Sequence, residues 1–97
     1  MYMRTIELSQ GYEALVDDDM YSLVASYSWS VVKMNSNRYA KRTVNGKSVY
    51  MHRFIMERAF NRVLKKTAVV DHIDNNGLNN QISNLRVVTA SHNHMNS

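Results

Sequence analysis

The sequence predicts a small α+β domain, in which a small antiparallel β-sheet region is followed by a helix, two further strands and a terminal helix. Short runs of β-branched and aromatic residues separated by turn residues predict strands over residues 5–16 and 29–50. The apolar period then becomes helical over residues 51–61. Ninety-seven residues without a proline or a repeat make one domain, which we divide into residues 1–50 and 51–97.

A β-hairpin and a short helix are predicted for the first part of the chain. Residues 5–8 and 12–16 flank a Ser9-Gln10-Gly11 turn. Asp17 is expected to cap a helix that carries Asp18 and Asp19 in its first turn. A metal site is the alternative for these three carboxylates, but neighbouring side chains on a helix point in different directions. One apolar stripe of this helix contains Met20, Leu23, Val24 and Tyr27.

A three-stranded meander is predicted over residues 29–34, 38–44 and 47–50. Asn45-Gly46 favours a type I′ turn between the last two strands, because both central residues of that turn need a positive φ. Trp29 is expected to anchor the core rather than to stack on a base.

The charges of the chain are unevenly distributed. Residues 1–27 carry a net charge of −4, residues 28–53 carry +6 without a single acid, and residues 54–97 carry +2. The basic stretch indicates a phosphate-binding surface, and a solvated basic face explains it equally well. Period 2 places Arg38 and Arg42 on one face of the predicted sheet, and the pattern leaves open which face meets solvent.

Composition limits the environment and the possible metal ligands. The chain has no cysteine, so a metal must be held by oxygen or imidazole ligands. It has neither an apolar run of membrane-spanning length nor the apolar core of a signal peptide near Met1. We therefore expect a soluble protein of the cytoplasm (the host cell's, if a phage encodes it) that does not bind a membrane.

The last part of the chain combines residue types that suit phosphodiester cleavage. A short β-branched run, residues 67–70, ends at the pair Asp71-His72, and residues 85–88 are the expected return strand. The segment between them is rich in asparagine, which tolerates tight turns. Thr89 is expected to cap a terminal helix that carries Asn93. This arrangement can place a hard-metal pocket beside a general base.

These residues form a recognisable motif, whose parts are Asp71-His72-Ile73-Asp74, Asn84-Leu85-Arg86, Thr89, Asn93 and Asn96. The motif resembles that of the HNH endonucleases with the ββα-metal fold, and most of all the phage and intron-borne homing type. The upstream segment Tyr50–Met56 matches a segment that precedes the site in those proteins. Residues 11–19 and 29–40 also resemble the N-terminal part of phage members, which is similar to the AP2 DNA-binding sheet.

The resemblance implies a role for each matching residue. His72 would be the general base, Asp71 and Asn93 the metal ligands, and Asn84 a structural residue that ties the loop and orients His72. The implied metal is Mg²⁺ or Mn²⁺, which prefer oxygen ligands. Asp74 would fix the loop, and His52 would pack structurally and hydrogen-bond the backbone. The expected DNA contacts are Arg38, Lys41, Arg42, Lys47, Arg53 and Arg86.

The expected function is that of a metal-dependent DNA endonuclease acting on duplex DNA. One such site cuts one strand, so a monomer would nick, and cutting both strands would need a homodimer or sequential events. The alternative is a non-catalytic DNA-binding or inhibitory phage protein that keeps the fold. His92 and His94 flank Asn93, and either would make the metal site more zinc-like if the terminal helix were rotated.

Overall fold

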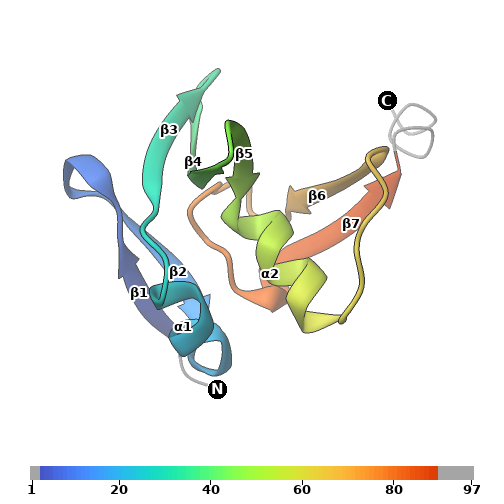
Figure 1. Cartoon of the computed structure of the whole chain (residues 1–97). Helices are drawn as coiled ribbons and strands as arrows, with labels where there is room; N and C mark the ends of the chain where they lie inside the picture. Colours follow the sequence, from blue (N-terminus) through green and yellow to red (C-terminus); the bar gives the residue numbers. More distant parts are fainter. Residues whose placement is uncertain (1–2, 90–97) are drawn as a thin grey trace.

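Three separate antiparallel sheets and two α-helices make up the part of the chain that the structure, a computed structural model, describes: residues 3–89. Figure 1 shows the N-terminal hairpin and the C-terminal strand pair at opposite sides, with helix α2 between them. This arrangement agrees with the predicted α+β class. Within residues 3–89, neither helix is long and apolar enough to cross a membrane.

The N-terminal hairpin was predicted correctly. Strand β1 (Met3–Glu7) pairs antiparallel with β2 (Glu13–Asp17), and Ile6 lies opposite Ala14. The connection is a 3₁₀ turn over Ser9–Gly11, in which Gly11 has a φ of 80°. Ile6 and Ala14 are buried, so one face of the hairpin packs into the core.

Helix α1 (Asp18–Ala25) begins where it was predicted, but Asp17 does not cap it through its side chain. The Asp17 carboxylate instead accepts a hydrogen bond from the backbone N–H of Ile82, with 2.7 Å between Oδ2 and N. The expected apolar stripe does face the core: Val24 is fully buried, and Met20, Leu23 and Tyr27 pack against it. Asp17 therefore connects the helix start to the C-terminal part of the chain.

The three-stranded meander was also predicted correctly. It contains β3 (Ser30–Met34), β4 (Asn37–Val44) and β5 (Lys47–Tyr50), with β4 in the centre. Asn45 and Gly46 have φ values of 51° and 79°, as the predicted turn requires.

Burial now distinguishes the two faces of this sheet. Ala40 of β4 is fully buried, so its face meets the core. Because side chains alternate along a strand, Arg38 and Arg42 share that face with Ala40, while Tyr39 and Lys41 lie on the opposite, more open face.

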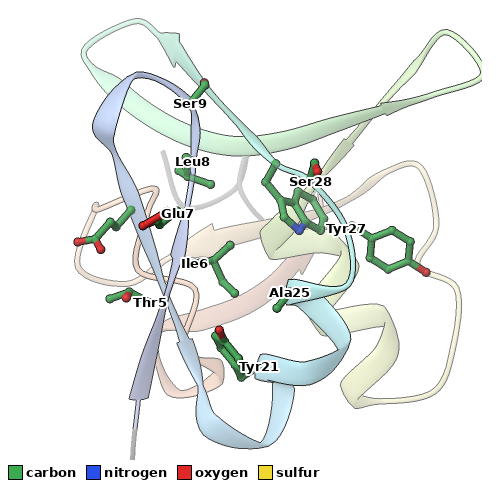
Figure 2. A pocket seen from close by; sticks show the side chains of 11 residues that line it. Thr5, Ile6, Glu7, Leu8, Ser9, Tyr21, Ala25, Tyr27 and Ser28 are labelled. Atoms are coloured by element: carbon green, nitrogen blue, oxygen red, sulfur yellow. The ribbon is translucent and has the colours of Figure 1, made fainter.

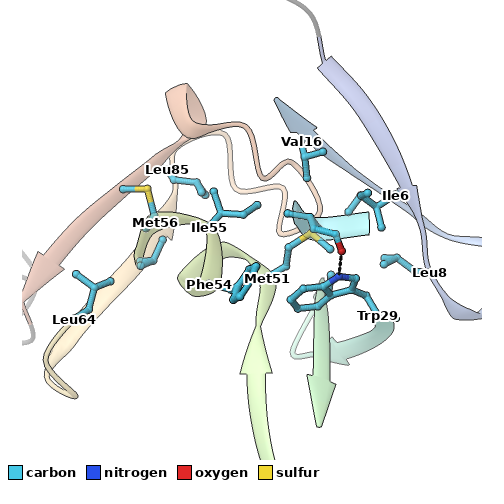
Figure 3. Close-up of a cluster of buried hydrophobic side chains, with 14 of the residues drawn as sticks. Ile6, Leu8, Val16, Trp29, Met51, Phe54, Ile55, Met56, Leu64 and Leu85 are labelled. Atoms are coloured by element: carbon cyan, nitrogen blue, oxygen red, sulfur yellow. Dashed lines mark hydrogen bonds between the residues drawn. The ribbon is translucent and has the colours of Figure 1, made fainter. Parts of the chain in front are cut away.

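Helix α2 (Met51–Ala59) supplies the centre of the core (Figure 3). Its buried residues are Met51, Phe54, Ile55 and Met56. Trp29 packs beside Phe54 with 5.6 Å between ring centroids, and its Nε1 donates to the Val24 carbonyl oxygen at 2.9 Å. Trp29 is therefore a core anchor, as predicted.

The helix ends two residues earlier than the predicted Asn61. Asn61 has a φ of 52°, a left-handed conformation that cannot continue an α-helix. Ala59 and Phe60, at the end of the helix, are exposed.

The last sheet pairs β6 (Ala68–His72) with β7 (Leu85–Thr89) antiparallel, as predicted. Asp71 lies opposite Arg86, and His72 lies opposite Leu85. The expected terminal helix, with Asn93, Asn96, His92 and His94, lies outside the described residues. The final helix of a ββα arrangement therefore stays a prediction.

Both N-terminal sheets hold the loop between β6 and β7. Leu15 of β2 donates its N–H to the Leu78 carbonyl and accepts from the N–H of Asn80, both at 2.8 Å. Asn37, at the start of β4, accepts from the N–H of Gly77 at 3.1 Å. Residues far apart in the sequence thus determine the path of this loop.

We predict that Gly77→Ala destabilises the protein by about 1–3 kcal/mol, the usual range for overpacking a core. A methyl group at residue 77 would overlap the Arg38 carbonyl oxygen and lie 2.7 and 2.8 Å from two ring carbons of Tyr39. Urea unfolding measures the change, and Ser83→Ala at an exposed position is the control. Equal stability of the two variants would contradict the predicted close approach.

Candidate active site

His72 ends strand β6 and points inward. Its side chain is only 5% exposed, as expected from the inward position that it shares with Val70 along the strand. Its Nε2 lies 2.7 Å from Oδ1 of Asn80. Two other rings pack against it, His52 at 4.8 Å and Tyr39 at 5.8 Å between centroids. The ring is therefore held on several sides.

Asp71 lies next to His72 in sequence but on the other side of the strand. Its carboxylate forms an ion pair with Arg86, directly opposite on β7. Nε and Nη2 of Arg86 both reach Oδ2, at 3.0 and 2.8 Å, and no residue among 3–89 donates a hydrogen bond to Oδ1. The two side chains are 42% and 58% exposed, so this pair is in contact with solvent.

A pocket of about 270 Å³ brings the predicted base and the predicted metal ligand together. It lies between the open face of the three-stranded sheet and strand β6. Its lining residues are Met34, Tyr39, Tyr50, His52, Val69, Val70, Asp71 and His72.

A larger pocket of about 660 Å³ lies between the N-terminal hairpin and helix α1 (Figure 2). Glu7, Tyr21 and Tyr27 are among its lining residues, and it contains none of the site residues predicted from the sequence. The smaller pocket is therefore the candidate active site.

Asn84 and Asp74 fix the loop that follows His72. Oδ1 of Asn84 accepts from the Asp74 N–H at 3.1 Å, and its Nδ2 donates to Asp74 Oδ1 at 2.8 Å and to the Asn79 carbonyl at 2.9 Å. Hydrogen bonds from Asn79, Asn76 and Asn84, in that order of effect, lower the pKa of Asp74 below its usual value. Both residues thus tie the loop as expected, but the Asn84 side chain does not itself bond to His72.

Asn80 is the residue that sequence reasoning missed. It is completely buried, and its carbonyl oxygen bonds to the His72 ring while its Nδ2 has no partner among the described residues. Nothing in the sequence separates Asn80 from the other asparagines of the loop. Its importance follows only from the fold, because its backbone bond to Leu15 turns it inward.

His52 lies at the start of α2, and its ring packs against Tyr39, Tyr50 and His72, as expected. Its Nδ1 is buried without any partner among residues 3–89, so it does not hydrogen-bond the backbone as predicted. Burial, followed by the nearby His72 and Arg53, lowers the pKa of His52 from 6.5 to about 4. His52 is therefore neutral at pH 7.

Arg53 is a structural clamp, and its expected role as a DNA contact stays a prediction. Its guanidinium donates to the carbonyl oxygens of Ala68, Leu64 and Lys65 at 2.8, 3.0 and 2.6 Å. It also forms an ion pair with Glu57 at 3.7 Å. These bonds fasten the connector between α2 and β6.

The other predicted DNA contacts lie on the three-stranded sheet, except Arg86, which lies on β7. Arg38 lies over the Tyr12 ring at 4.8 Å, and Arg42 lies over the Tyr27 ring at 4.0 Å. Lys41, on the opposite face, donates to the Ser48 hydroxyl at 3.3 Å, while Lys47 is exposed. Arg86 is bound to Asp71.

A complete metal site cannot be assembled from the described residues. Residues 3–89 contain no cluster of three or more histidine, cysteine, aspartate or glutamate side chains that could hold an ion. Asp71 supplies one carboxylate with an oxygen that no described residue bonds. The expected second ligand, Asn93, lies outside the part that the structure describes.

Comparison with known proteins points to a class of nuclease. Residues 49–95 match the model of a family described as HNH endonuclease. The whole chain is also similar to an uncharacterized HNH endonuclease of Acanthamoeba polyphaga mimivirus, with 33% identity over 96 residues. The alignment covers 99% of this chain and 49% of that protein, so the chain spans about half the length of this curated relative.

Both matches are similarities to HNH endonucleases. Nucleases of this family act on DNA and generally use divalent metal ions. The matched region contains Asp71, His72, Asn84 and Asn93. No solved structure matches the chain.

We predict that acid destabilises the protein partly through His52. Between pH 6.5 and about 4 the unfolded chain binds a proton at His52 that the folded chain does not, so the free energy of unfolding falls as the pH falls. The slope from one such group is at most about 1.4 kcal/mol per pH unit. Urea unfolding of the wild type and of His52→Phe at several pH values measures it. Equal slopes in the two proteins would contradict the lowered pKa.

Proposed function

We propose that this chain is a metal-dependent DNA endonuclease that hydrolyses phosphodiester bonds with His72 as the general base. The observation that supports this most strongly is the state of the His72 ring. Its Nε2 forms a hydrogen bond with Asn80. No described residue forms a hydrogen bond with Nδ1, and Nδ1 is not one of the buried side-chain atoms that lack a partner. One ring nitrogen is thus left to accept a proton, on a residue that lines the same pocket as Asp71.

The proposed reaction needs a proton acceptor next to the attacking water. His72 Nδ1 takes a proton from the water as the water oxygen forms a bond to phosphorus. The bond from phosphorus to the 3′ oxygen breaks, and that oxygen takes a proton from solvent. The products are a 5′-phosphate and a 3′-hydroxyl. The proton then leaves His72 for solvent, which restores the base.

Asp71 is the proposed ligand of the divalent ion, together with Asn93. The free Oδ1 of Asp71 is a hard anionic oxygen, the type of donor that suits Mg²⁺ or Mn²⁺. When bound, such an ion supplies positive charge that stabilises the negative charge on the phosphate and on the departing oxygen.

The open face of the three-stranded sheet is the proposed side of DNA approach. Tyr39 and Tyr50 of this face line the pocket that also contains His72. Lys41 lies on the same face by the alternation of β4. A duplex at the pocket would therefore meet Lys41, whereas Arg38, Arg42 and Lys47 lie on the opposite face, that of Ala40. Arg86 would contact a phosphate near Asp71.

We further propose that a single chain nicks one strand and that cutting both strands needs a homodimer or two successive events. The phage and intron homing type, an AP2-like N-terminal sheet and action in the cytoplasm belong to the same proposal. The sequence motif supports the homing type, and the three-stranded meander is compatible with an AP2-like sheet.

A second candidate is a non-catalytic DNA-binding or inhibitory protein. The ion pair between Arg86 and Asp71 favours it, because a carboxylate bound to a guanidinium is a weaker metal ligand. Retention of a proton acceptor beside that carboxylate favours the nuclease instead.

We predict that His72→Ala lowers the rate of plasmid nicking by about 10²–10⁴-fold, the usual contribution of a general base, without weakening DNA binding. Asp71→Ala should remove the response of nicking to added Mg²⁺ or Mn²⁺. Gel assays of supercoiled plasmid, with and without EDTA, measure both effects.

Asp19→Ala is the matched control, because Asp19 is an exposed acid on α1. It should nick like the wild type. Wild-type rates in His72→Ala would disprove the base assignment, and a wild type that binds DNA but never nicks it would favour the non-catalytic candidate.

We also predict that Lys41→Gln weakens duplex binding and lowers the salt dependence, expressed as the slope of log K against log salt, by about one. Lys33→Gln removes the same charge from the opposite face of the sheet. Lys33 lies directly across from Arg38, so it shares the face of Arg38 and Ala40. This variant should change the slope less. Fluorescence anisotropy at several salt concentrations gives both slopes, and the reverse order would mean that DNA meets the other face.

A further inference from the structure

The buried polar atoms without partners are concentrated around His72. Two such side-chain atoms occur within residues 3–89, Nδ1 of His52 and Nδ2 of Asn80. Both side chains touch His72, one through ring packing at 4.8 Å and the other through a 2.7 Å hydrogen bond. Within the described residues, both buried side-chain atoms that lack a hydrogen-bond partner thus belong to neighbours of the same imidazole.

Folding alone does not explain Asn80. A buried donor without a partner destabilises a protein, and an apolar side chain of similar shape avoids this cost. The Asn80 side chain makes one hydrogen bond in the described structure, to His72. A buried group that remains partly unsatisfied calls for a specific explanation, and the orientation of His72 provides one.

We propose that Asn80 is a positioning residue that fixes the tautomer of His72. Its carbonyl oxygen can only accept a hydrogen bond, so it selects the form of His72 with the proton on Nε2. The proton acceptor is then Nδ1, the nitrogen that no described residue occupies. This inference rests on the proposed function, in which His72 is the base.

The N-terminal hairpin holds the backbone of this positioning residue. The backbone N–H of Asn80 donates to the Leu15 carbonyl at 2.8 Å, and Leu15 lies in β2. The hairpin precedes the region that matches the nuclease family, residues 49–95. The orientation of the base therefore depends on residues outside that region.

Nuclear magnetic resonance of the full-length, metal-free protein labelled with ¹⁵N-histidine tests the tautomer directly. At pH 8 we expect the wild type to show His72 protonated on Nε2, with that proton protected from exchange by Asn80. A His72→Gln spectrum assigns the signal. Protonation on Nδ1 in the wild type would overturn the proposal without the need for any variant.

Three variants separate positioning from general support of the loop. Asn80→Asp keeps an acceptor and should keep the protected Nε2 proton, whereas Asn80→Leu should lose it. Asn79→Ala is the matched control, because the Asn79 side chain bonds to Asp74 and Gln81 but not to His72. It should keep the signal. A protected Nε2 proton that survives in Asn80→Leu would overturn the proposal.

Kinetics give an independent readout. We expect Asn80→Leu to lower kcat for plasmid nicking by at least about tenfold with little change in KM, because the base is misoriented while DNA contacts remain. Asn80→Asp should recover most of kcat. An equal loss in Asn80→Leu and Asn79→Ala would contradict a specific role. A protein that never cuts DNA would refute the proposed function alone, since the tautomer is measured without cleavage.

Discussion

The hydrogen bonds within the loop between β6 and β7 are the constraint on which the candidate site depends. Apart from the 3₁₀ turn at Ile82–Asn84, this loop has no helix to satisfy its backbone groups. Side chains do so instead. Asp74 accepts from the Asn76 N–H at 2.8 Å, and Asn84 accepts from the Asp74 N–H at 3.1 Å. Asn84 also donates to the carbonyl of Asn79, next to the Asn80 that bonds to His72, so the loop and the base are positioned together.

The first half of the chain completes this arrangement. Leu15 bonds the loop on both sides of Asn79, Asp17 holds the N–H of Ile82, and Asn37 holds Gly77. None of these three partners lies in the region that matches the nuclease family, residues 49–95. The N-terminal sheets are thus more than an attached binding surface. They are part of the support of the site, and Gly77 can approach β4 closely because it has no Cβ.

Local patterns predicted the elements well, and long-range contacts account for what they missed. The Asn45-Gly46 turn and the stripe that contains Val24 depend on neighbouring residues, so the sequence shows them directly. Asp17 was expected to cap its own helix, but a distant N–H is its partner. For Arg53 the sequence suggested a DNA contact but not its bonds to three carbonyls of the folded connector. In the sequence Asn80 does not differ from the other loop asparagines, and only its backbone bond to Leu15 of β2 turns it inward.

The two halves of the candidate site differ in how firmly they are held. His72 is buried between Asn80 and a neutral His52, so it can change orientation only if the core rearranges. Asp71 is paired with Arg86 in contact with solvent, and exposed ion pairs of this kind contribute only about 0–1 kcal/mol. A cation or a phosphate can therefore replace either partner at little cost. A rigid base beside an exchangeable carboxylate suits a site that must keep its proton acceptor fixed while metal and DNA enter and leave.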